Sequence, residues 1–550
     1  MSDRPAERKA RGAFFTPAPI TRFLAEWAVR SPQDRVLEPS CGEAEFLLAA
    51  GSRLRDLGAG LFAGETLHGV ELHAPSAAIA SARVRDSGFA ADLVVSDFFD
   101  VPARPENDVV IGNPPYIRYQ DFSGASRSKA LRAALEDGVR LNGLASSWAA
   151  FVVHAARFLK DGGRLALVLP AELLSVKYAA EVRRFLLRRF GSVKLVMFED
   201  LVFPGVQEEV VLLLAEGEGP AGHFEVHLAR DAEDLPRADK AAWVAYSPGA
   251  DDKWMPAVLR PEVVDTYRAL TGADAFETLV DWGDTYLGAV TGRNRYFSLD
   301  REAVFRLRIP KDELLPISPP GSRHLRDLTF TDGAWEALLA EDRSCYLLMP
   351  NVTKPSREAL EYIWAGEKTG VHKAYKCRVR SPWWRVPTVP VADLLLTYMD
   401  RDRPRLVTNR AGVCHLNSLY GVRLRPGRRK LGMDLLPLAA VNSLTLLGGE
   451  LVGRAYGGGM LKLEPREADN LPLPSFTLLA RVAANLRPLR ATVSQAIRDG
   501  DLLGAVELVD QVILSDALGL APERIAELRE AREIMFGRRA SRATRSNGTG

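Results

Sequence analysis

Short runs of apolar residues recur through the first 215 residues of the chain, with helix-like stretches between them. Because the runs are nearly continuous in Val, Leu and Ile, they suit strands that are covered on both faces. Alternation of such strands with helices is typical of a mostly parallel, doubly wound sheet, so the pattern predicts an α/β fold. The predicted strands are Arg35–Glu38, Leu67–Glu71, Asp92–Val95, Asp108–Gly112, Arg164–Leu169, Val193–Phe198 and Val210–Ala215.

Polar or conformationally special residues follow four consecutive predicted strands. In doubly wound sheets, ligands bind beyond the carboxyl ends of the strands. Four such ends in a row therefore predict one ligand site at this edge of the sheet. The segments are Glu38-Pro39-Ser40-Cys41-Gly42, Glu71, Asp97-Phe98 and Asn113-Pro114-Pro115-Tyr116.

Taken singly, most of these residues also fit structural roles. Gly42 fits a turn, Glu71 and Asp97 fit helix caps or solvated acids, and Cys41 fits a small packed residue. The loop of residues 113–116 is different, because two successive prolines force a rigid, extended backbone and cannot donate ladder hydrogen bonds. A stiff loop with an amide at one end and an aromatic ring at the other is poorly explained as a turn.

The pattern changes after Glu216, where the turn-rich stretch EGEGPAG begins. We place a domain boundary near residue 245, and helical periodicity dominates from residue 477 to residue 533. The last residues, rich in Ser, Thr, Asn and Gly, have the composition of a disordered tail. The sequence therefore predicts a first domain at 1–245, a second at 246–475, a helical segment at 476–537 and a disordered tail at 538–550.

The charges of the whole chain nearly cancel, with 72 Lys and Arg against 70 Asp and Glu, so net charge alone does not indicate a nucleic-acid partner. Residues 371–430 differ, because 14 Lys and Arg face only 3 Asp there. This local excess, interleaved with aromatic residues, favours a surface that contacts DNA phosphates; a solvated charged face is the alternative. The aromatic residues and the last cations of the stretch are Tyr375, Trp383, Trp384, Arg428, Arg429 and Lys430.

Cysteine usage and hydropathy exclude several classes of protein. The four cysteines lie far apart without a CxxC pair, which argues against a disulfide framework and a zinc cluster and suits a reducing cytosol. The charged N-terminus has no signal-peptide core, and no stretch reaches the ~18 apolar residues of a membrane span. We therefore expect a cytoplasmic protein without a metal site or a membrane partner.

Six motifs in order resemble the amino-methyltransferases of bacterial restriction–modification systems, in the adenine-N6-specific group whose target-recognition domain follows the catalytic domain. The resemblance covers roughly residues 10–215, and NPPY is its most specific element. One departure is an alanine in EPSCGEAEF, where many relatives carry a further glycine. The motifs are GAFFTP (12–17), VLEPSCGEAEFL (36–47), GVEL (69–72), SDFF (96–99), NPPYIRY (113–119) and DGGRLALVLPAELL (161–174).

The resemblance implies S-adenosylmethionine as the cofactor and the N6 amino group of a flipped-out adenine in double-stranded DNA as the substrate. The side-chain oxygen of Asn113 and the carbonyl of Pro114 would accept the amino hydrogens, with Pro115 stiffening the loop. Tyr116 would stack on the base. Phe203 matches a second aromatic contact, with a core phenylalanine as an equal alternative.

The resemblance also implies the cofactor contacts. The loop Glu38-Pro39-Ser40-Cys41-Gly42 would meet the methionine part, and Glu71 would bind the ribose hydroxyls. Asp97 would accept a hydrogen bond from the cofactor's adenine, with Phe98 flanking that ring. Phe14, Phe15 and Thr16 would close over the methionine end.

Other functions compete with this interpretation. The NPPY motif also occurs in methyltransferases that act on RNA or on protein glutamine, but some 300 further residues with basic and aromatic stretches favour DNA. A non-catalytic DNA-specificity subunit is the other alternative, and the intact NPPY opposes it. The chain has no Pro-Cys dipeptide for cytosine C5 methylation and no nuclease-like group of carboxylates. A restriction endonuclease is therefore expected as a separate partner.

Overall fold

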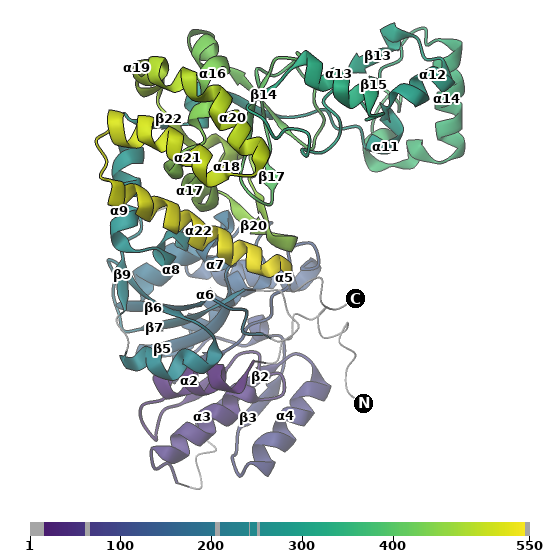
Figure 1. Ribbon diagram of the computed structural model, residues 1–550. Helices are drawn as coiled ribbons and strands as arrows, with labels where there is room; N and C mark the ends of the chain where they lie inside the picture. Colours follow the sequence, from purple (N-terminus) through teal and green to yellow (C-terminus); the bar gives the residue numbers. More distant parts are fainter. Residues whose placement is uncertain (1–15, 61–65, 204–208, 241–242, 250–252, 545–550) are drawn as a thin grey trace. The chain divides into compact units, whose positions relative to one another are not determined.

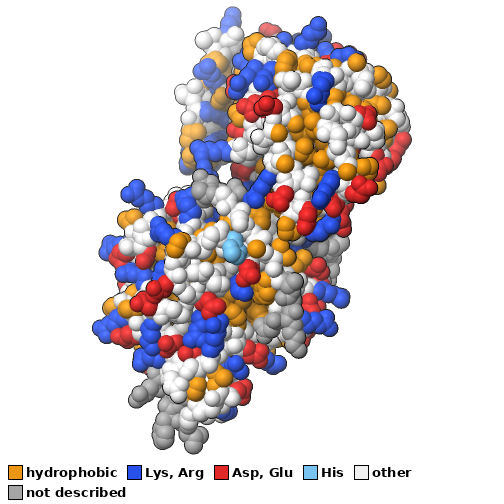
Figure 2. All heavy atoms as spheres, turned by 90° about the vertical axis from the view of Figure 1, so that its left-hand side faces the viewer, with side chains coloured by type: hydrophobic (Ala, Val, Ile, Leu, Met, Phe, Trp, Pro, Cys, Tyr) orange, Lys and Arg blue, Asp and Glu red, His pale blue; other side chains and the backbone are white. Residues whose placement is uncertain are grey.

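The computed structural model describes residues 16–60, 66–203, 209–240, 243–249 and 253–544 (Figure 1). Phe14 and Phe15 lie outside these residues. Contacts between residues divide the chain into two compact units, Met1–Pro261 and Glu262–Gly550. On the face in Figure 2, basic and acidic side chains are interspersed over much of the surface.

The first unit is built on a nine-stranded sheet with the strand order β3-β2-β1-β4-β5-β7-β6-β8-β9. Strands β1 to β5 are parallel to one another, whereas β7 runs antiparallel to both of its neighbours, β5 and β6. All seven predicted strands are present and the α/β fold class is confirmed; β8 and β9 are additional. The strands are β1 (Val36–Glu38), β2 (Leu67–Glu71), β3 (Asp92–Val95), β4 (Asn107–Gly112), β5 (Leu159–Pro170), β6 (Ser192–Phe198), β7 (Val210–Glu216), β8 (Phe224–Ala229) and β9 (Val244–Tyr246).

Helices cover both faces of this sheet. Successive residues of a strand point to opposite faces. Ala166 and Val168 of β5 pack in the cluster around α2, while Leu165 and Leu167, equally buried, face the other side, where α6 contacts β5 and α8 contacts β6. The helices are α2 (Ala18–Ala28), α3 (Glu45–Asp56), α4 (Ala74–Asp86), α5 (Gly124–Glu136), α6 (Ser147–Ala156), α7 (Glu172–Ser175) and α8 (Ala180–Arg189).

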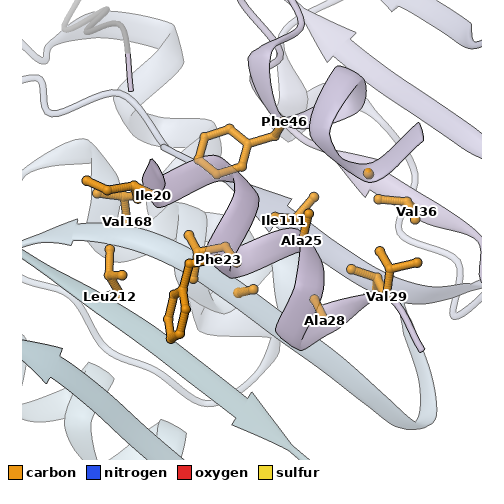
Figure 3. Packing of buried hydrophobic residues seen from close by; sticks show 14 of the residues in the cluster. Ile20, Phe23, Ala25, Ala28, Val29, Val36, Phe46, Ile111, Val168 and Leu212 are labelled. Atoms are coloured by element: carbon orange, nitrogen blue, oxygen red, sulfur yellow. The ribbon is translucent and has the colours of Figure 1, made fainter. Parts of the chain in front are cut away.

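The apolar stripe of α2 is the centre of the first core (Figure 3). Ile20 and Phe23 recur at helical spacing and lie against Val168 of β5 and Leu212 of β7, while Phe46 of α3 packs on the same cluster. Burying side chains of this size contributes roughly 1.5–3 kcal/mol each. The packing fixes α2 against β5 and its neighbour β4, whose carboxyl end forms part of the site described below.

The first unit ends at Pro261 rather than near residue 245. Strand β9 pairs with β8, and Trp254, which is 1% exposed, lies against Phe224 with ring centroids 4.2 Å apart. These contacts keep the chain in the first core beyond the turn-rich stretch that suggested a boundary.

The second unit combines four small sheets. A five-stranded sheet has the order β11-β19-β16-β18-β14, and a three-stranded sheet, β12-β15-β13, belongs to the lobe that also carries α11, α12 and α14 (Figure 1). The remaining sheets are β10-β22 and β17-β21-β20. The strands are β10 (Phe276–Thr278), β11 (Gly283–Leu287), β12 (Ser298–Leu299), β13 (Leu314–Pro316), β14 (Thr329–Phe330), β15 (Tyr346–Leu348), β16 (Leu394–Leu396), β17 (Met399–Asp400), β18 (Leu406–Asn409), β19 (Tyr420–Leu424), β20 (Arg454–Tyr456), β21 (Met460–Lys462) and β22 (Pro472–Pro474).

Helices of the second unit surround these sheets. Among the described residues, no single helix is long and apolar enough to cross a membrane. Only α16 and α17 taken together have the length and composition of a span, and the two helices are bent by 89° relative to each other. The helices are α9 (Pro261–Gly272), α10 (Leu279–Trp282), α11 (Asn294–Phe297), α12 (Arg301–Leu307), α13 (Asp332–Ala340), α14 (Arg357–Lys368), α15 (Tyr375–Arg378), α16 (Pro426–Ala439), α17 (Ser443–Val452), α18 (Pro465–Asp469), α19 (Phe476–Leu486), α20 (Arg490–Asp499), α21 (Leu502–Asp510) and α22 (Pro522–Thr544).

The C-terminal helices belong to the second unit instead of forming a separate segment, because α19 packs on α16 and α22 packs on α17. Helix α22 continues to Thr544, so the disorder predicted from residue 538 is wrong for residues 538–544. Arg539 explains the difference. Its guanidinium is buried, forms an ion pair with Glu450 at 2.6 Å and donates to the carbonyl of Arg401 at 2.8 Å.

His415 is enclosed in the five-stranded sheet of the second unit. The side chain is 0% exposed, and a Cβ atom at Gly421 would lie 2.4 Å from its Cε1, so the strand can pass the ring only with glycine there. Burial lowers the pKa of His415 from its ordinary value to about 4. The ring is therefore neutral in the folded protein at pH 7.

We predict that acid weakens the fold through His415. The folded pKa lies below the unfolded value of about 6.5, so the unfolded chain binds the proton first, and stability declines as the pH falls from 6.5 toward 4. The contribution lost at pH 5 is about 2 kcal/mol. Urea unfolding at pH 7.5 and 5.0 measures it: the wild type should lose about that much more than His415→Leu, which does not titrate. Equal losses in the two proteins would contradict the assignment.

Candidate functional site

The carboxyl ends of β3, β2, β1 and β4 meet at one edge of the sheet because these strands are adjacent and parallel. The chain adds β2 and β3 on one side of β1 and β4 and β5 on the other, so the strand order reverses between β1 and β4. Doubly wound sheets bind ligands at such a switch point. The structure thus brings the segments of Gly42, Glu71, Asp97 and Asn113 to the same edge, as the sequence predicts.

The loop after β1 is tied to the end of β2. The N–H of Gly42 donates to Oε2 of Glu71 at 2.8 Å, and the N–H of Cys41 donates to the carbonyl of Val70 at 2.9 Å. Gly42 has a φ of +50°, and a Cβ placed on it would meet nothing within 4 Å. The loop therefore leaves an open cradle at Gly42, where no other part of the described chain approaches that Cβ position closely.

Ala44, at the position where relatives carry a further glycine, adopts a left-handed conformation with φ +72° and ψ +27°. This conformation costs a residue with a Cβ roughly 1–2 kcal/mol. Ala44 is 0% exposed and packs in the core around α2, so burial of its methyl group offsets part of the strain. The alanine keeps the turn that a glycine would form.

Glu38 and Cys41 are held inside the loop. Glu38 is 2% exposed, and its Oε2 accepts a hydrogen bond from the N–H of Leu47 in α3 at 3.0 Å. Burial raises the pKa of Glu38 well above its usual range. Cys41 is 3% exposed, and burial raises the pKa of its thiol. Both residues, together with buried Pro39, therefore shape the loop, and their side chains expose almost no surface to a ligand.

Glu71 retains capacity for a ligand. Its Oε2 accepts from Gly42 and its Oε1 accepts from the N–H of His73 at 2.8 Å. A carboxylate has about four lone-pair positions, so two remain for further donors such as hydroxyl groups. The next residue, Leu72, is 70% exposed at this strand end. The sequence did not predict Leu72 as a candidate ligand contact, because only its exposure in the folded protein distinguishes it from a leucine of the core.

Asp97 lies half-buried after β3. Its Oδ1 accepts from the N–H of Phe99 at 3.1 Å, and its Oδ2 lies 3.8 Å from Nζ of Lys129, which also pairs with Asp100. The side chain is 18% exposed and keeps free acceptor positions on the side of Oδ2. Asp97 is thus both a cap of a short 3-10 turn and an available acceptor.

The ring of Phe98 lies among other aromatic rings after β3. The ring is 3% exposed and stacks on Phe151 and Phe158, with centroids 5.2 and 5.0 Å away, and the ring of His154 meets its edge at 4.7 Å. Packing against the helix layer covers the ring, so contact between Phe98 and a cofactor ring stays a prediction.

Asn113 is held by a residue 97 positions earlier in the chain. Its Nδ2 donates to Oγ1 of Thr16 at 3.1 Å, whereas its Oδ1 is buried without a partner among the described residues. Leaving a buried acceptor unsatisfied costs roughly 1–3 kcal/mol. Thr16 itself is 6% exposed, so its side chain contacts the Asn113 amide and has little surface for a ligand. The amide is fixed with its acceptor uncommitted, as a site that binds an N–H donor requires.

Tyr116 and Phe203 border the core beneath this loop. The hydroxyl of Tyr116 donates to the carbonyl of Val168 at 3.0 Å, and its ring is half-buried, so the rest of the ring can meet a ligand. Phe203 is 4% exposed and packs in the core around α2. The core alternative therefore describes Phe203 better than a substrate contact.

Several cations of the basic stretch of residues 371–430, namely Arg403, Arg405, Arg428 and Arg429, form ion pairs within the second unit. Arg428 forms an ion pair with Glu277 and lies 5.5 Å from the ring centroids of both Trp282 and Phe476. Arg429 pairs with Asp393 at 2.7 Å, although 61% of its side chain is exposed. Lys430 is exposed. These contacts favour a structural role for Arg428, and its contact with DNA stays a prediction.

The tryptophans of this stretch also differ from the prediction. Trp384 is 7% exposed, and Trp383 packs in the same cluster and donates from Nε1 to Glu367 at 2.9 Å. Tyr375 is 65% exposed, with Nζ of Lys376 5.6 Å from its ring centroid. Of the three aromatic residues only Tyr375 presents a large exposed surface.

A cavity of about 570 Å³ lies elsewhere in the second unit, between α20 and the region of β14. Its arginines are paired: Arg487 and Arg490 share Asp434, and Arg498 pairs with Asp327. None of the motif residues lines it, so the hollow is separate from the strand-end site.

The sheet, the open cradle at Gly42 and the loop with an uncommitted Asn113 acceptor define a class of protein, the methyltransferases with a Rossmann-like sheet that act on amino groups. Comparison with protein families finds two consecutive matches. N-6 DNA methylase matches residues 3–217, and the C-terminal domain of the type II methyltransferase M.Eco57I matches residues 251–514.

Similar proteins extend over most of the chain. The type II methyltransferase M.AccI of Acinetobacter calcoaceticus is 23% identical, and M.XamI of Xanthomonas campestris pv. amaranthicola is 26% identical; each alignment covers 84% of this chain and 85% of the relative. The solved structure of the type IIL restriction-modification enzyme MmeI in complex with DNA has a TM-score of 0.52 at 11% identity, covering 93% of this chain and 73% of that one. This last likeness shows the fold alone.

Over residues 3–217 the chain matches the N-6 DNA methylase family, as its motifs predict. It is a DNA methyltransferase of the restriction–modification type that acts on the N6 amino group of adenine, with S-adenosylmethionine as the methyl donor.

We predict that Arg428→Ala destabilises the second unit instead of changing DNA contacts. Loss of the half-buried ion pair and of two ring contacts should cost about 1–2 kcal/mol, or a few degrees in Tm. Thermal unfolding measures this, with exposed Lys430→Ala as the matched control that leaves Tm unchanged. An Arg428→Ala protein with normal Tm and a flattened salt dependence of DNA binding would restore the phosphate-contact role.

Proposed function

We propose that the enzyme methylates an adenine that has rotated out of the duplex, with the Asn113 oxygen and the Pro114 carbonyl as acceptors for its amino hydrogens. The amino lone pair delocalises into the ring, and two acceptors that hold the hydrogens localise it on nitrogen. This proposal rests above all on Oδ1 of Asn113, which is buried and has no hydrogen-bond partner among the residues that the structure describes. Catalysis by such groups rests on positioning and preorganised electrostatics.

The target base needs an aromatic surface to stack on as well as hydrogen-bond acceptors. A base inside a duplex cannot reach a loop at a sheet edge, so it must be extruded. The partly exposed ring of Tyr116, anchored through its hydroxyl to β5, is rigid and suited to stack on that base. In this arrangement Thr16 orients the Asn113 amide so that the oxygen, not the NH₂ group, faces the substrate.

The residues at the strand ends fit the methyl donor. S-adenosylmethionine, when bound, supplies a methyl group on a positively charged sulfur. The backbone cradle at Gly42 suits close approach of its methionine part, the remaining acceptor positions of Glu71 suit the ribose hydroxyls, and Oδ2 of Asp97 suits an amino group. The exposed side chain of Leu72 offers an apolar face to its adenine ring.

We further propose that the second unit selects the DNA sequence. Exposed cations such as Lys430, and Tyr375 with its neighbouring lysine, would contact phosphates, and other side chains would read base edges. A separate cognate endonuclease would cut the same sequence when it is unmethylated. The enzyme would work in the cytoplasm, where bacterial DNA lies.

We predict that Glu71→Ala and Asp97→Ala each weaken S-adenosylmethionine binding tenfold or more, because hydrogen bonds to a charged group contribute roughly 1.5–3 kcal/mol. Leu72→Ala should weaken it several-fold through lost apolar contact. Titration calorimetry measures the affinities, and the exposed acid Glu106 provides a control, Glu106→Ala. Unchanged affinity in both acidic variants would remove these residues from the cofactor site.

We predict that Asn113→Ala lowers methylation by about 10²–10³-fold while cofactor affinity stays within a few-fold, since the lost oxygen acts on the transition state. Asn113→Asp keeps two acceptors, and Thr16 can donate to them, so it should retain more activity than the alanine variant. Transfer of labelled methyl groups to duplex DNA gives the rates. A folded Asn113→Ala enzyme with near-normal activity would refute the proposal.

A further inference from the structure

Ser147, the first residue of α6, holds the loop that carries Asn113. Its Oγ donates to the carbonyl of Pro115 at 2.5 Å and accepts from the N–H of Ile117 at 2.9 Å. Its backbone N–H also donates to the carbonyl of Ile117 at 3.0 Å. The three bonds bracket Tyr116 on both sides, and Ser147 is only 1% exposed. One buried serine therefore fixes the second half of the loop.

The loop needs such an external support because of its composition. Pro114 and Pro115 have no N–H groups, so neither can anchor the loop by donating a backbone hydrogen bond. Position must come from carbonyls, from side chains and from the next N–H groups along the chain. Ser147 engages one carbonyl and one N–H at the point where the prolines end.

The first turn of α6 is itself held by a buried polar cluster around Glu172. Nε1 of Trp148 donates to Oε2 of Glu172 at 3.1 Å, and the hydroxyl of Tyr178 donates to the same oxygen at 2.5 Å. Ser146 adds a longer bond at 3.4 Å. Glu172 follows β5, the strand whose Val168 carbonyl receives the Tyr116 hydroxyl. The two supports of the loop, Ser147 and the Tyr116 hydroxyl bond, are thus both anchored at β5 or at the residue cluster directly after it.

We propose that Ser147 is a positioning residue for methyl transfer, which sets the place of Asn113 and Tyr116 through the loop backbone. The proposal rests on the proposed role of Asn113. Because Ser147 is only 1% exposed, it has almost no surface for the base or the donor, and we expect its effect on the rate of the chemical step and not on the binding of either. A displacement of about 1 Å in such a group can lower a rate by about 10²-fold.

The test compares Ser147→Ala, which removes both side-chain bonds, with Ser147→Thr, which keeps the hydroxyl. Ser128→Ala is the matched control, because the hydroxyl of Ser128 is exposed and donates to the carbonyl of Gly124 within helix α5. We expect Ser147→Ala to lower the single-turnover methylation rate about 10–100-fold, with affinities for S-adenosylmethionine and DNA within two-fold. Ser147→Thr and Ser128→Ala should stay within a few-fold of the wild type.

Hydrogen exchange of the peptide spanning residues 113–119, measured without DNA, should accelerate in Ser147→Ala because the Ile117 N–H loses its acceptor. Unchanged exchange, an unchanged rate, or equal rate losses in the alanine and threonine variants would each overturn the proposal. If Ser147→Ala does not fold, Ser147→Cys weakens the same bonds and must show the same losses. An active Asn113→Ala would instead defeat the proposed function, and the exchange result would be unaffected by it.

Discussion

Parallel pairing of β1 with β2 on one side and with β4 on the other is the constraint on which the site depends. Val36 pairs in register with both Leu67 and Val109, so the three strands end at nearly the same level. The loop after β1 can then reach Glu71, and the loop after β4 begins beside it. A shift of one residue in either register would turn alternate side chains to the other face and separate the cradle from the Asn113 loop.

Two hydrogen bonds fix the positions of acceptor groups at this edge of the sheet. The bond from Gly42 to Glu71 couples the cradle to an acid that still has acceptor positions, and the bond from Asn113 to Thr16 leaves one amide oxygen uncommitted. Both bonds join segments far apart in sequence, and both lie in partly buried surroundings, where a lower dielectric strengthens them. The site is thus ordered before any substrate arrives, which is how electrostatic catalysis avoids reorganisation during the reaction.

The elements of the fold were predictable because continuous apolar runs require cover on both faces, and all seven runs form strands of one sheet. The strand-end positions of Glu71, Asp97 and Asn113 followed from the same pattern. Whether an aromatic side chain points into the core or toward a ligand could not be predicted from the sequence. Phe98, Phe203 and Trp384 would suit either environment chemically, and only the packing in the folded protein distinguishes the two. The Thr16–Asn113 bond and the Ser147 support could not be predicted either, since no local periodicity encodes contacts 97 or 32 positions apart.

The sequence also could not show which charged side chains are paired in the folded protein. Residues 371–430 carry a large excess of cations, yet acids inside and outside the stretch neutralise several of them: Asp393 pairs with Arg429, Asp400 with Arg405, and Glu277 with Arg428. A paired guanidinium that also packs against aromatic rings stabilises its own domain and has little left for a phosphate. If the second unit contacts DNA as proposed, the attraction must come from cations that stay exposed, and a count of cations along the sequence overstates it. Selection of a DNA sequence would then rest more on shape and a few base contacts than on a uniformly basic face.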